Sequence, residues 1–278
     1  MQKVAILGSS GMLGSMVKRV FEVYGDFKVV APSREELDAE YATNNMIENV
    51  LGDVDWVINC IGIIKPNINE NNQEDILRAI RVNSIFPNQL AQTKYKIIQI
   101  ETDCVFSGTV GFYKETDPHD PTDVYGKTKS LGEVKRPGYY HIRTSIIGPN
   151  GPKSLFDWVL NQPKNAKIDG YTTHSWNGVT TMDFASLCVH AVMGNVELKE
   201  SQHFLPAKMV SKFELVKLIA EIFDRKDITL NPKMIKPFIL RTLETNDKKH
   251  LDGLWLGMGY KEIPTVETML RELKIYIK

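Results

Sequence analysis

The chain of 278 residues has no excess of charge of either sign, because Lys plus Arg and Asp plus Glu both number 34. Proteins that bind nucleic acid usually carry a basic surplus, so the composition argues against a nucleic acid polymer as partner. Cysteine is also scarce. Cys60, Cys104 and Cys188 are widely spaced and odd in number, which suggests neither a disulfide framework nor a metal site. They are typical of reduced thiols in the cytoplasm.

Long hydrophobic runs are missing as well. The longest, at residues 56–64, is far shorter than the roughly 20 residues that span a bilayer. The first residues lead straight into a short apolar segment and a glycine loop, with no signal-peptide pattern. We therefore expect a cytoplasmic protein without a membrane partner.

The first half of the chain alternates short apolar runs with helical periodicity. We expect strands at residues 4–7, 27–30, 54–60, 96–100 and 139–143, and helices at 12–24, 43–51, 74–94 and 125–134. This alternation predicts right-handed βαβ units. The predicted fold class is α/β, with a Rossmann-type doubly wound parallel sheet.

The pattern changes after about Gly148, where residues 149–152 form a linker-like cluster of Pro, Asn, Gly and Pro. Beyond it we expect helices at 181–193, 212–223 and 266–276, and a strand at 203–205. The predicted organisation is a dinucleotide-binding domain at 1–148, to which 178–207 return. Residues 149–177 and 208–278 form a smaller substrate-binding lobe.

A glycine-rich turn, Gly8-Ser9-Ser10-Gly11-Met12-Leu13-Gly14, follows the first expected strand. Glycine lets backbone N–H groups approach a pyrophosphate, and the helix that follows adds a partial positive charge. A plain tight turn is the alternative, but the position between the first strand and the first helix favours a dinucleotide. The expected cofactor contacts here are Gly8, Ser10, Gly11, Met12, Leu13 and Gly14.

The second expected strand ends in Ala31-Pro32-Ser33-Arg34, without the acidic residue that favours NAD. Ser33 and Arg34 suit a 2′-phosphate, which favours NADP, with NAD as the alternative. The competing interpretation is that Ser33 caps a helix and Arg34 is solvated. Asp38 is a further candidate for the adenine side of the cofactor.

Tyr125 and Lys129 are four residues apart and would share a helix face. A nearby ammonium lowers the pKa of a phenol, which lets such a pair exchange a proton with a carbonyl or an alcohol. Upstream, Thr102 and Asp103 follow an expected strand; Thr102 would hold a substrate oxygen and Asp103 would accept from sugar hydroxyls. The alternatives are a surface helix pair and a capped turn.

Three motifs together resemble the extended short-chain dehydrogenase/reductase superfamily: the glycine loop, Thr102-Asp103-x-Val105-Phe106-x-Gly108, and Tyr125-Gly126-Lys127-x-Lys129-x-x-Gly132-Glu133. Within it they look most like the dTDP-4-dehydrorhamnose reductase family. The resemblance runs from residue 3 to about residue 190 and is strongest in these motifs. Two features depart from the reductases: bulky residues at 60–64, where small alanines are usual, and Cys104, where relatives often have Tyr.

The resemblance implies roles by position. Tyr125 would be the proton donor, Lys129 its activator and a ribose ligand, and Thr102 the third catalytic residue. The segment of Cys60, Ile61 and Gly62 would pass under the nicotinamide. The expected substrate contacts are Thr102, Asp103, Asn83, Trp176 and Asn177, with packing as the alternative for Trp176.

The implied activity is NAD(P)H-dependent reduction of a nucleotide-linked 4-keto-6-deoxy sugar, in deoxysugar and polysaccharide biosynthesis. The alternatives are an NAD-dependent sugar-nucleotide epimerase and a non-catalytic, NADP-binding regulatory subunit. A dehydratase is disfavoured because no Asp-Glu pair follows Thr102. Members of the superfamily often pair through helices, so a homodimer is compatible with the resemblance.

Overall fold

The structure is a computed structural model that describes residues 1–151 and 153–277. Pro152, which belongs to the expected linker cluster, and Lys278, the last residue of the expected lobe, lie outside the described residues.

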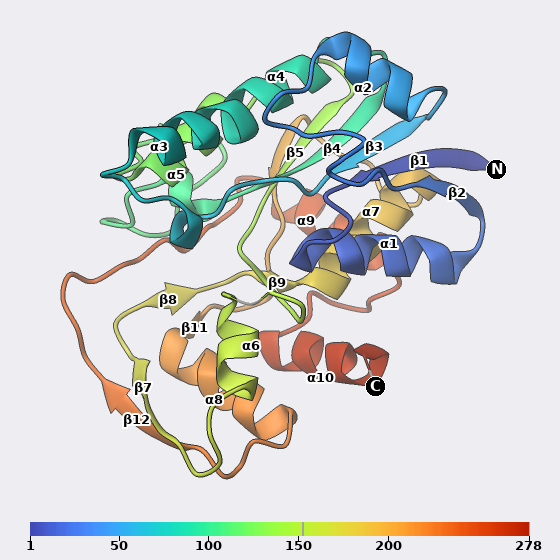
Figure 1. The fold of residues 1–278 in the computed structure, drawn as a ribbon. Coiled ribbons are helices and arrows are strands. Elements are labelled where there is room, and N and C mark those ends of the chain that lie inside the picture. Colours follow the sequence, from blue (N-terminus) through green and yellow to red (C-terminus); the bar gives the residue numbers. More distant parts are fainter. Residues whose placement is uncertain (152, 278) are drawn as a thin grey trace.

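A six-stranded sheet forms the centre of the molecule (Figure 1). Its strands are, in spatial order, β10 (Ser201–His203), β5 (Tyr139–Arg143), β4 (Lys96–Glu101), β3 (Trp56–Asn59), β1 (Gln2–Leu7) and β2 (Phe27–Val30). All neighbours run parallel. The chain adds β2 on one side of β1 and β3 on the other, so the carboxyl ends of β1 and β3 border the crevice where such sheets bind ligands. The predicted α/β, Rossmann-type fold is confirmed.

Helices cover both faces of this sheet (Figure 1). One face carries α1 (Met12–Tyr24) and α7 (Thr181–Met193); the other carries α2 (Asn44–Leu51), α3 (Gln73–Ile80), α4 (Phe86–Leu90) and α5 (Val124–Leu131). Successive side chains of a strand point to opposite faces, which gives two hydrophobic cores. From β1, Val4 and Ile6 enter the core beneath α1 and α7, whereas Ala5 and Leu7 enter the other core.

The smaller C-terminal part lies below the sheet in Figure 1. Its strand pairs are β6 (Ile146–Ile147) with β9 (Val179–Thr180), β7 (Lys167–Tyr171) with β12 (Thr229–Lys233), and β8 (Ser175–Trp176) with β11 (Val210–Ser211). Its helices are α6 (Leu155–Leu160), α8 (Lys212–Ile222) and α10 (Val266–Ile277). A further helix, α9 (Lys248–Gly257), returns to the central sheet, where Trp255 stacks on Phe204 beside β10.

Several element boundaries differ from the predictions. The expected helix at 74–94 is interrupted by a π-helical segment, η2 (Arg81–Ile85), and ends at Leu90. Pro87 has no N–H to donate to the carbonyl of Asn83, so regular α-helical bonding is broken there. The expected helix at 125–134 ends at Leu131, before Gly132.

The expected strand at 203–205 is wrong by two residues, because pairing with β5 places it at Ser201–His203. The helices α6 and α9 and the short strand pairs were not predicted from the sequence. The six residues of α6 and the two-residue strands β6, β8, β9 and β11 are too short to show a hydrophobic period.

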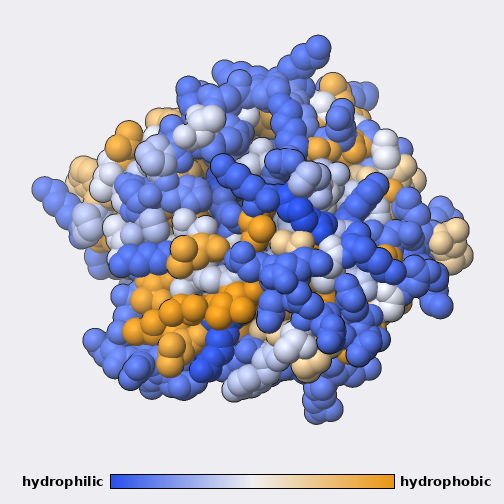
Figure 2. Space-filling view, turned by 90° about the horizontal axis from the view of Figure 1, so that it is seen from above, coloured by the Kyte–Doolittle hydropathy of each residue, from blue (hydrophilic) through white to orange (hydrophobic). Residues whose placement is uncertain are grey.

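The surface seen from above is mostly hydrophilic, with hydrophobic residues gathered in a patch at the lower left (Figure 2). Across residues 1–151 and 153–277, no helix is long and apolar enough to cross a membrane.

Candidate cofactor and catalytic site

A cavity of about 430 Å³ lies at the carboxyl ends of β1, β2 and β3. It is lined by four separate segments of the chain, three of which include Gly8, Ser10, Gly11, Ser33, Arg34, Asp38, Cys60, Ile61 and Gly62. The fold thus brings nine of the expected cofactor contacts to one place. Met12, Leu13 and Gly14 lie next to them, in the first turn of α1.

The start of α1 fits a pyrophosphate. Its N-cap is Gly11, which offers no side-chain cap, so the first N–H groups of the helix are free for an anion. Gly14 allows this helix to lie directly on the turn: a Cβ atom there would be 2.1 Å from the carbonyl oxygen of Gly8. The residues present therefore suit the phosphates of a dinucleotide.

The end of the cavity beside β2 is rich in arginine. Arg34 Nε lies 3.0 Å from Asp38 Oδ2, and Arg34 Nη2 lies 3.7 Å from Glu40 Oε2. Arg78, which also lines the cavity, places Nε 3.4 Å from the same Glu40 oxygen. Ser33 exchanges hydrogen bonds with Glu36, but the segment is a turn and not the helix of the competing interpretation. Sequence reasoning missed Arg78, since no motif marks it.

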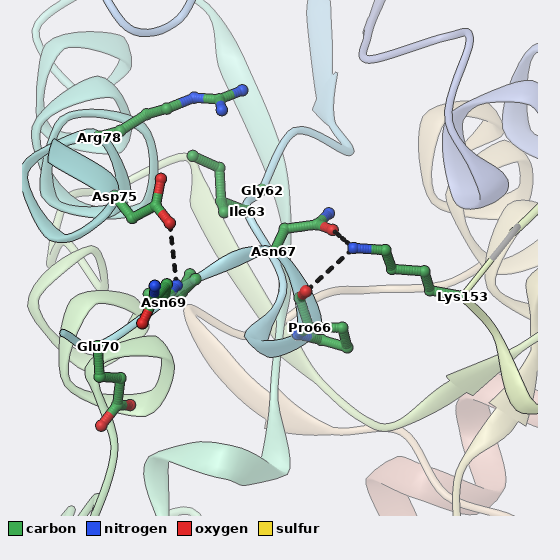
Figure 3. Close-up of a pocket in the computed structure, with 10 residues that line it drawn as sticks. Gly62, Ile63, Pro66, Asn67, Asn69, Glu70, Asp75, Arg78 and Lys153 are labelled. Carbon is green, nitrogen blue, oxygen red and sulfur yellow. Dashed lines mark hydrogen bonds between the residues drawn. The ribbon is translucent and has the colours of Figure 1, made fainter. Parts of the chain in front are cut away.

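A second cavity, of about 620 Å³, adjoins the first and shares Gly62, Ile63 and Arg78 with it (Figure 3). Lys153, from the chain beyond β6, reaches across it. Its ammonium donates to the carbonyl oxygen of Pro66 at 3.0 Å and to Asn67 Oδ1 at 2.6 Å. Lys153 thereby ties the C-terminal part of the chain to the loop that follows β3.

Thr102 and Tyr125 meet at the carboxyl end of β4. The hydroxyl of Thr102 accepts from the N–H of Cys104 at 3.1 Å and donates to Asp103 Oδ1 at 3.2 Å. Helix α5 lies close against this turn because residue 126 is glycine; a Cβ there would be 2.2 Å from the Cys104 carbonyl oxygen. This contact sets Tyr125, the residue before Gly126, against the turn that Thr102 begins.

The pKa of Tyr125 is raised, chiefly by burial and further by the charges of Cys104, Asp103 and Glu101, while the polar side chain of Thr102 opposes the rise. The spacing of Tyr125 and Lys129 predicts a lowered pKa, but burial dominates in the structure and the net shift is upward. The Lys129 ammonium lies 3.0 Å from Glu101 Oε2 and donates to the carbonyl oxygen of Ile100 at 2.9 Å. A buried carboxylate therefore compensates its charge.

Asp103 faces two cations from the C-terminal part. Burial raises the pKa of Asp103, and the positive charges of Lys212 and Arg241 oppose that rise. The Lys212 ammonium lies 5.6 Å from the centre of the Trp176 ring, and Arg241 Nε donates to the carbonyl oxygen of Phe106 at 2.9 Å. Neither cation belongs to a motif that the sequence could reveal.

Three of the expected substrate contacts have structural partners instead. Asn83 binds the backbone of Ile63 through both ends of its amide, at 2.8 and 2.9 Å. Asn177 does the same with Leu243, at 3.1 and 2.7 Å. Trp176 is 4% exposed and packs in the hydrophobic core, as the alternative interpretation of this residue had it. Asn83 thereby holds Ile63, which lines both cavities.

The parallel sheet, the glycine turn after β1 and the group of Thr102, Tyr125 and Lys129 define the class: an extended short-chain dehydrogenase/reductase. The chain belongs to the RmlD substrate binding domain family, whose model matches residues 1–242.

Named relatives fall into two groups. The chain is 24% identical over 285 residues to methionine adenosyltransferase 2 subunit beta of Bos taurus, with 92% of this chain and 83% of that protein covered. It is 27% identical over 250 residues to dTDP-4-dehydrorhamnose reductase of Mycolicibacterium smegmatis, with 85% and 72% covered.

Solved structures share the fold. The dTDP-4-dehydrorhamnose reductase of Bacillus anthracis in complex with NADP superposes with a TM-score of 0.81 at 18% identity, covering 100% of both chains. The corresponding protein of Clostridium acetobutylicum gives 0.79 at 20% identity, covering 99% of both chains.

Proposed function

We propose that this protein reduces a nucleotide-linked 4-keto-6-deoxy sugar with NADPH, as a step of deoxysugar or polysaccharide biosynthesis. The observation that carries the proposal is that helix α5 sets Tyr125 against the turn of Thr102, with Lys129 one helical turn further on, in a fold whose cavity at the ends of β1, β2 and β3 suits a dinucleotide. Membership of the RmlD substrate binding domain family and the likeness to the named reductases support it.

In the proposed reaction Tyr125 gives its proton to the carbonyl oxygen of the sugar, and Thr102 holds that oxygen in place. NADPH, when bound, supplies the hydride. A tyrosine is protonated at neutral pH, which is the form that a proton donor needs, and burial moves the pKa of Tyr125 further up. Lys129 stands behind the phenol on the same helix and is assigned to the cofactor ribose.

Cofactor choice follows from charge at the end of β2. Arg34 and Arg78 gather around Glu40, and no carboxylate occupies the position directly after the strand. Arginine binds phosphate well, so this corner suits the 2′-phosphate of NADP better than a bare ribose. We therefore assign NADPH as the preferred reductant and NADH as the weaker alternative.

The substrate site is assigned to the cleft between the two parts of the chain. Asp103 would accept from sugar hydroxyls, and Lys212 and Arg241 would bind the diphosphate of the nucleotide. In this organisation residues 1–148 and 178–207 form the dinucleotide-binding domain, since they supply all the strands of the central sheet. Residues 149–177 and 208–278 form the substrate-binding lobe.

A second candidate function is that of a non-catalytic, NADP-binding regulatory subunit. The likeness to a protein named as a subunit of methionine adenosyltransferase favours it. The group of Thr102, Tyr125 and Lys129 favours the reductase, because a binding protein has no use for a proton donor beside the cofactor. We place the protein in the cytoplasm, on the basis of its free cysteines.

The deciding experiment is a panel of nucleotide-linked 4-keto-6-deoxy sugars, with oxidation of NADPH and of NADH followed separately. Tyr125→Phe should lower kcat by at least about 100-fold, because general acid catalysis contributes that much or more. Its dissociation constant for NADPH should stay near that of the unmodified protein, since only a hydroxyl is lost.

Tyr24→Phe is the matched control, because it removes a hydroxyl at the far end of α1, where it bonds to His190. Its turnover should be unchanged. Equal turnover of Tyr125→Phe and the unmodified protein would exclude Tyr125 as the proton donor. Tight NADPH binding without turnover of any sugar in the panel would instead support the regulatory subunit.

A further inference from the structure

A lysine contact joins the C-terminal part of the chain to the loop beside the proposed cofactor site. Lys153 lies directly before Ser154, the N-cap of α6. Its ammonium donates to the carbonyl oxygen of Pro66 at 3.0 Å and to Asn67 Oδ1 at 2.6 Å (Figure 3). Both acceptors belong to a short 3-10 helix, η1 (Lys65–Asn67), in the loop that follows β3. We call these two hydrogen bonds the Lys153 bridge.

The same loop is also fixed to the helix that carries the proposed proton donor. Lys65 Nζ lies 2.9 Å from Oδ2 of Asp123, the N-cap of α5. Further along the loop, Glu70 Oε1 accepts from the first N–H of α5 at 2.9 Å. Tyr125 is the second residue of that helix. The loop after β3 therefore runs from the cofactor cavity, which Gly62 lines, to the start of α5.

A dinucleotide that serves Tyr125 has to follow this loop. Its phosphates are assigned to the glycine turn at the start of α1, whereas its nicotinamide must lie beside the carbonyl group that Tyr125 would protonate, since hydride transfer needs close contact. The residues around the bridge meet both sides of this path. A Cβ atom at Gly151 would be 2.8 Å from the sulfur of Met12, in the first turn of α1, and Lys153 reaches η1. The Lys153 bridge therefore lies where the path begins, between the ends of β1 and β3.

Both acceptors of the Lys153 bridge are uncharged, and the bridge lies at the surface. Lys153, Pro66 and Asn67 are all exposed, so water can take the place of each partner when the bonds break. Exposed hydrogen bonds contribute modestly, and two of them together should favour the closed arrangement by about tenfold. The bridge therefore suits a contact that opens and closes more than a permanent support of the fold.

We propose that the Lys153 bridge is a gate on the cofactor path, which opens to let NADP(H) enter or leave and then closes again. This inference rests on the proposed function and deepens it, because it names a control of cofactor exchange at the same site. Both partners of the ammonium belong to the protein, so the bridge closes whether or not the dinucleotide is bound. Its loss therefore changes the rates of binding and release alike and leaves the affinity nearly unchanged.

The test follows association and dissociation of NADPH by the stopped-flow change in nicotinamide fluorescence, for the unmodified protein and for Lys153→Met. Methionine keeps the length of the side chain but cannot donate to Pro66 or Asn67. Both rate constants should rise by about tenfold, because a gate limits passage in both directions. The dissociation constant, which is their ratio, should stay within about threefold of that of the unmodified protein.

A second variant separates the contact from the charge. Asn67→Ala removes one acceptor of the Lys153 bridge and keeps the ammonium. Its two rate constants should rise together by a smaller factor of about three, because the bond to the Pro66 carbonyl remains. Rate constants that rise in Lys153→Met and stay unchanged in Asn67→Ala would assign the effect to the charge of Lys153 and would overturn the gate.

The matched control is Lys233→Met, which breaks another exposed lysine contact of the C-terminal part, at 2.6 Å to Asp169 between the paired strands β12 and β7. Both of its rate constants should equal those of the unmodified protein. Urea unfolding of each variant shows that the fold persists. Unchanged rate constants in Lys153→Met, or an equal rise in Lys233→Met, overturn the proposal.

The ratio of the two rate constants distinguishes a gate from a ligand. A dissociation constant that rises by about tenfold or more in Lys153→Met, with unaltered association, would mean that Lys153 binds the dinucleotide itself and would overturn the gate.

The measurement needs no sugar, which separates this inference from the proposed function. If NADPH binds and no sugar of the panel is reduced, the reductase proposal fails and the rate constants still decide the gate. If neither NADPH nor NADH binds to the unmodified protein, both proposals are overturned.

Discussion

The cavity proposed for the cofactor and the buried charges behind the proposed catalytic residues are built in opposite ways. The cavity is formed by turns at the ends of β1, β2 and β3, and its start at α1 offers backbone N–H groups. The buried charges are side chains on β4, β5 and β10 and around α5. We call them the polar network, made of Glu101, Lys129, Glu133, His141, Arg143 and His203.

The difference follows from strand geometry. Residues two apart in a strand point to the same face, so His141 and Arg143 of β5 lie beside Glu101 of the paired strand β4. Helix α5 covers that face with Lys129. A site made of backbone N–H groups, such as the glycine turn at residues 8–14, tolerates many different side chains. A buried charge network is destabilised when one of its members is lost, because the partner charge stays buried and unpaired. The proposed cofactor binding therefore depends on backbone groups, whereas the proposed proton chemistry depends on buried side-chain charges.

Removal of one buried charge should have the largest effect. Arg143 is 1% exposed; it contacts His203 Nε2 at 3.0 Å and His119 Nε2 at 2.9 Å, and it pairs with Glu133. Arg143→Met should lower the free energy of unfolding in urea by about 3–5 kcal/mol, because the Glu133 carboxylate then lacks its partner.

The control is Arg271→Met, which breaks an exposed pair with Glu267 and should change the free energy of unfolding by about 0.5 kcal/mol or less. NADPH affinity of the folded Arg143→Met protein should stay near that of the unmodified protein. A large loss of affinity would mean that the two regions are coupled and would break the comparison.

A change in the glycine turn at residues 8–14 should instead lower NADPH affinity and leave the stability of the fold nearly unchanged. Gly14→Ala places a Cβ atom 2.1 Å from the Gly8 carbonyl oxygen, so the helix must move away from the turn. We expect NADPH affinity, measured by calorimetry, to fall by about 100-fold, which corresponds to about 2.7 kcal/mol.

Gly11→Ala is the matched control, since its Cβ would be 3.4 Å from the same oxygen, an ordinary contact. Its affinity should fall much less, although a bulkier side chain at this position would fill the cavity. Equal losses for the two alanine variants would show that the close approach at Gly14 is not what matters.

The smallest predicted effect is the pH response of the polar network. Burial and the charge of Arg143 together lower the pKa of His203 to about 4. The unfolded chain therefore binds a proton below its ordinary pKa of about 6.5 while folded His203 stays neutral. This favours the unfolded state as pH falls, so His203 should account for about 1 kcal/mol of lost stability between about pH 7 and pH 5.5.

Urea unfolding at both pH values, on the unmodified protein and on His203→Gln, measures this contribution. Gln can donate to Glu244 and accept from Arg143 as the imidazole does, but it does not titrate. His141, whose pKa is raised, acts with the opposite sign in both proteins. An equal loss of stability in both proteins would mean that a group other than His203 takes up the proton.

Much of the fold could be predicted from local patterns. The bounds of α1, β2, β5 and α7 agree with the hydrophobic periods, because long amphipathic helices and buried parallel strands leave a clear signal. The interruption at η2 and the short elements of the C-terminal part could not be predicted, because they depend on Pro87 and on packing between segments distant in the chain.

The site divides in the same way. The sequence by itself determined the α/β fold, the proposed cofactor turn and the spacing of Thr102, Tyr125 and Lys129, because each is recorded in a local pattern or motif of the chain. Only the tertiary structure decided that Lys129 binds Glu101, that Asn83 and Asn177 hold backbone, and that Arg78, Lys212 and Arg241 line or face the site. The physical reason is that the partner of a buried charge is set by which strand and helix faces meet, and no local pattern records that meeting.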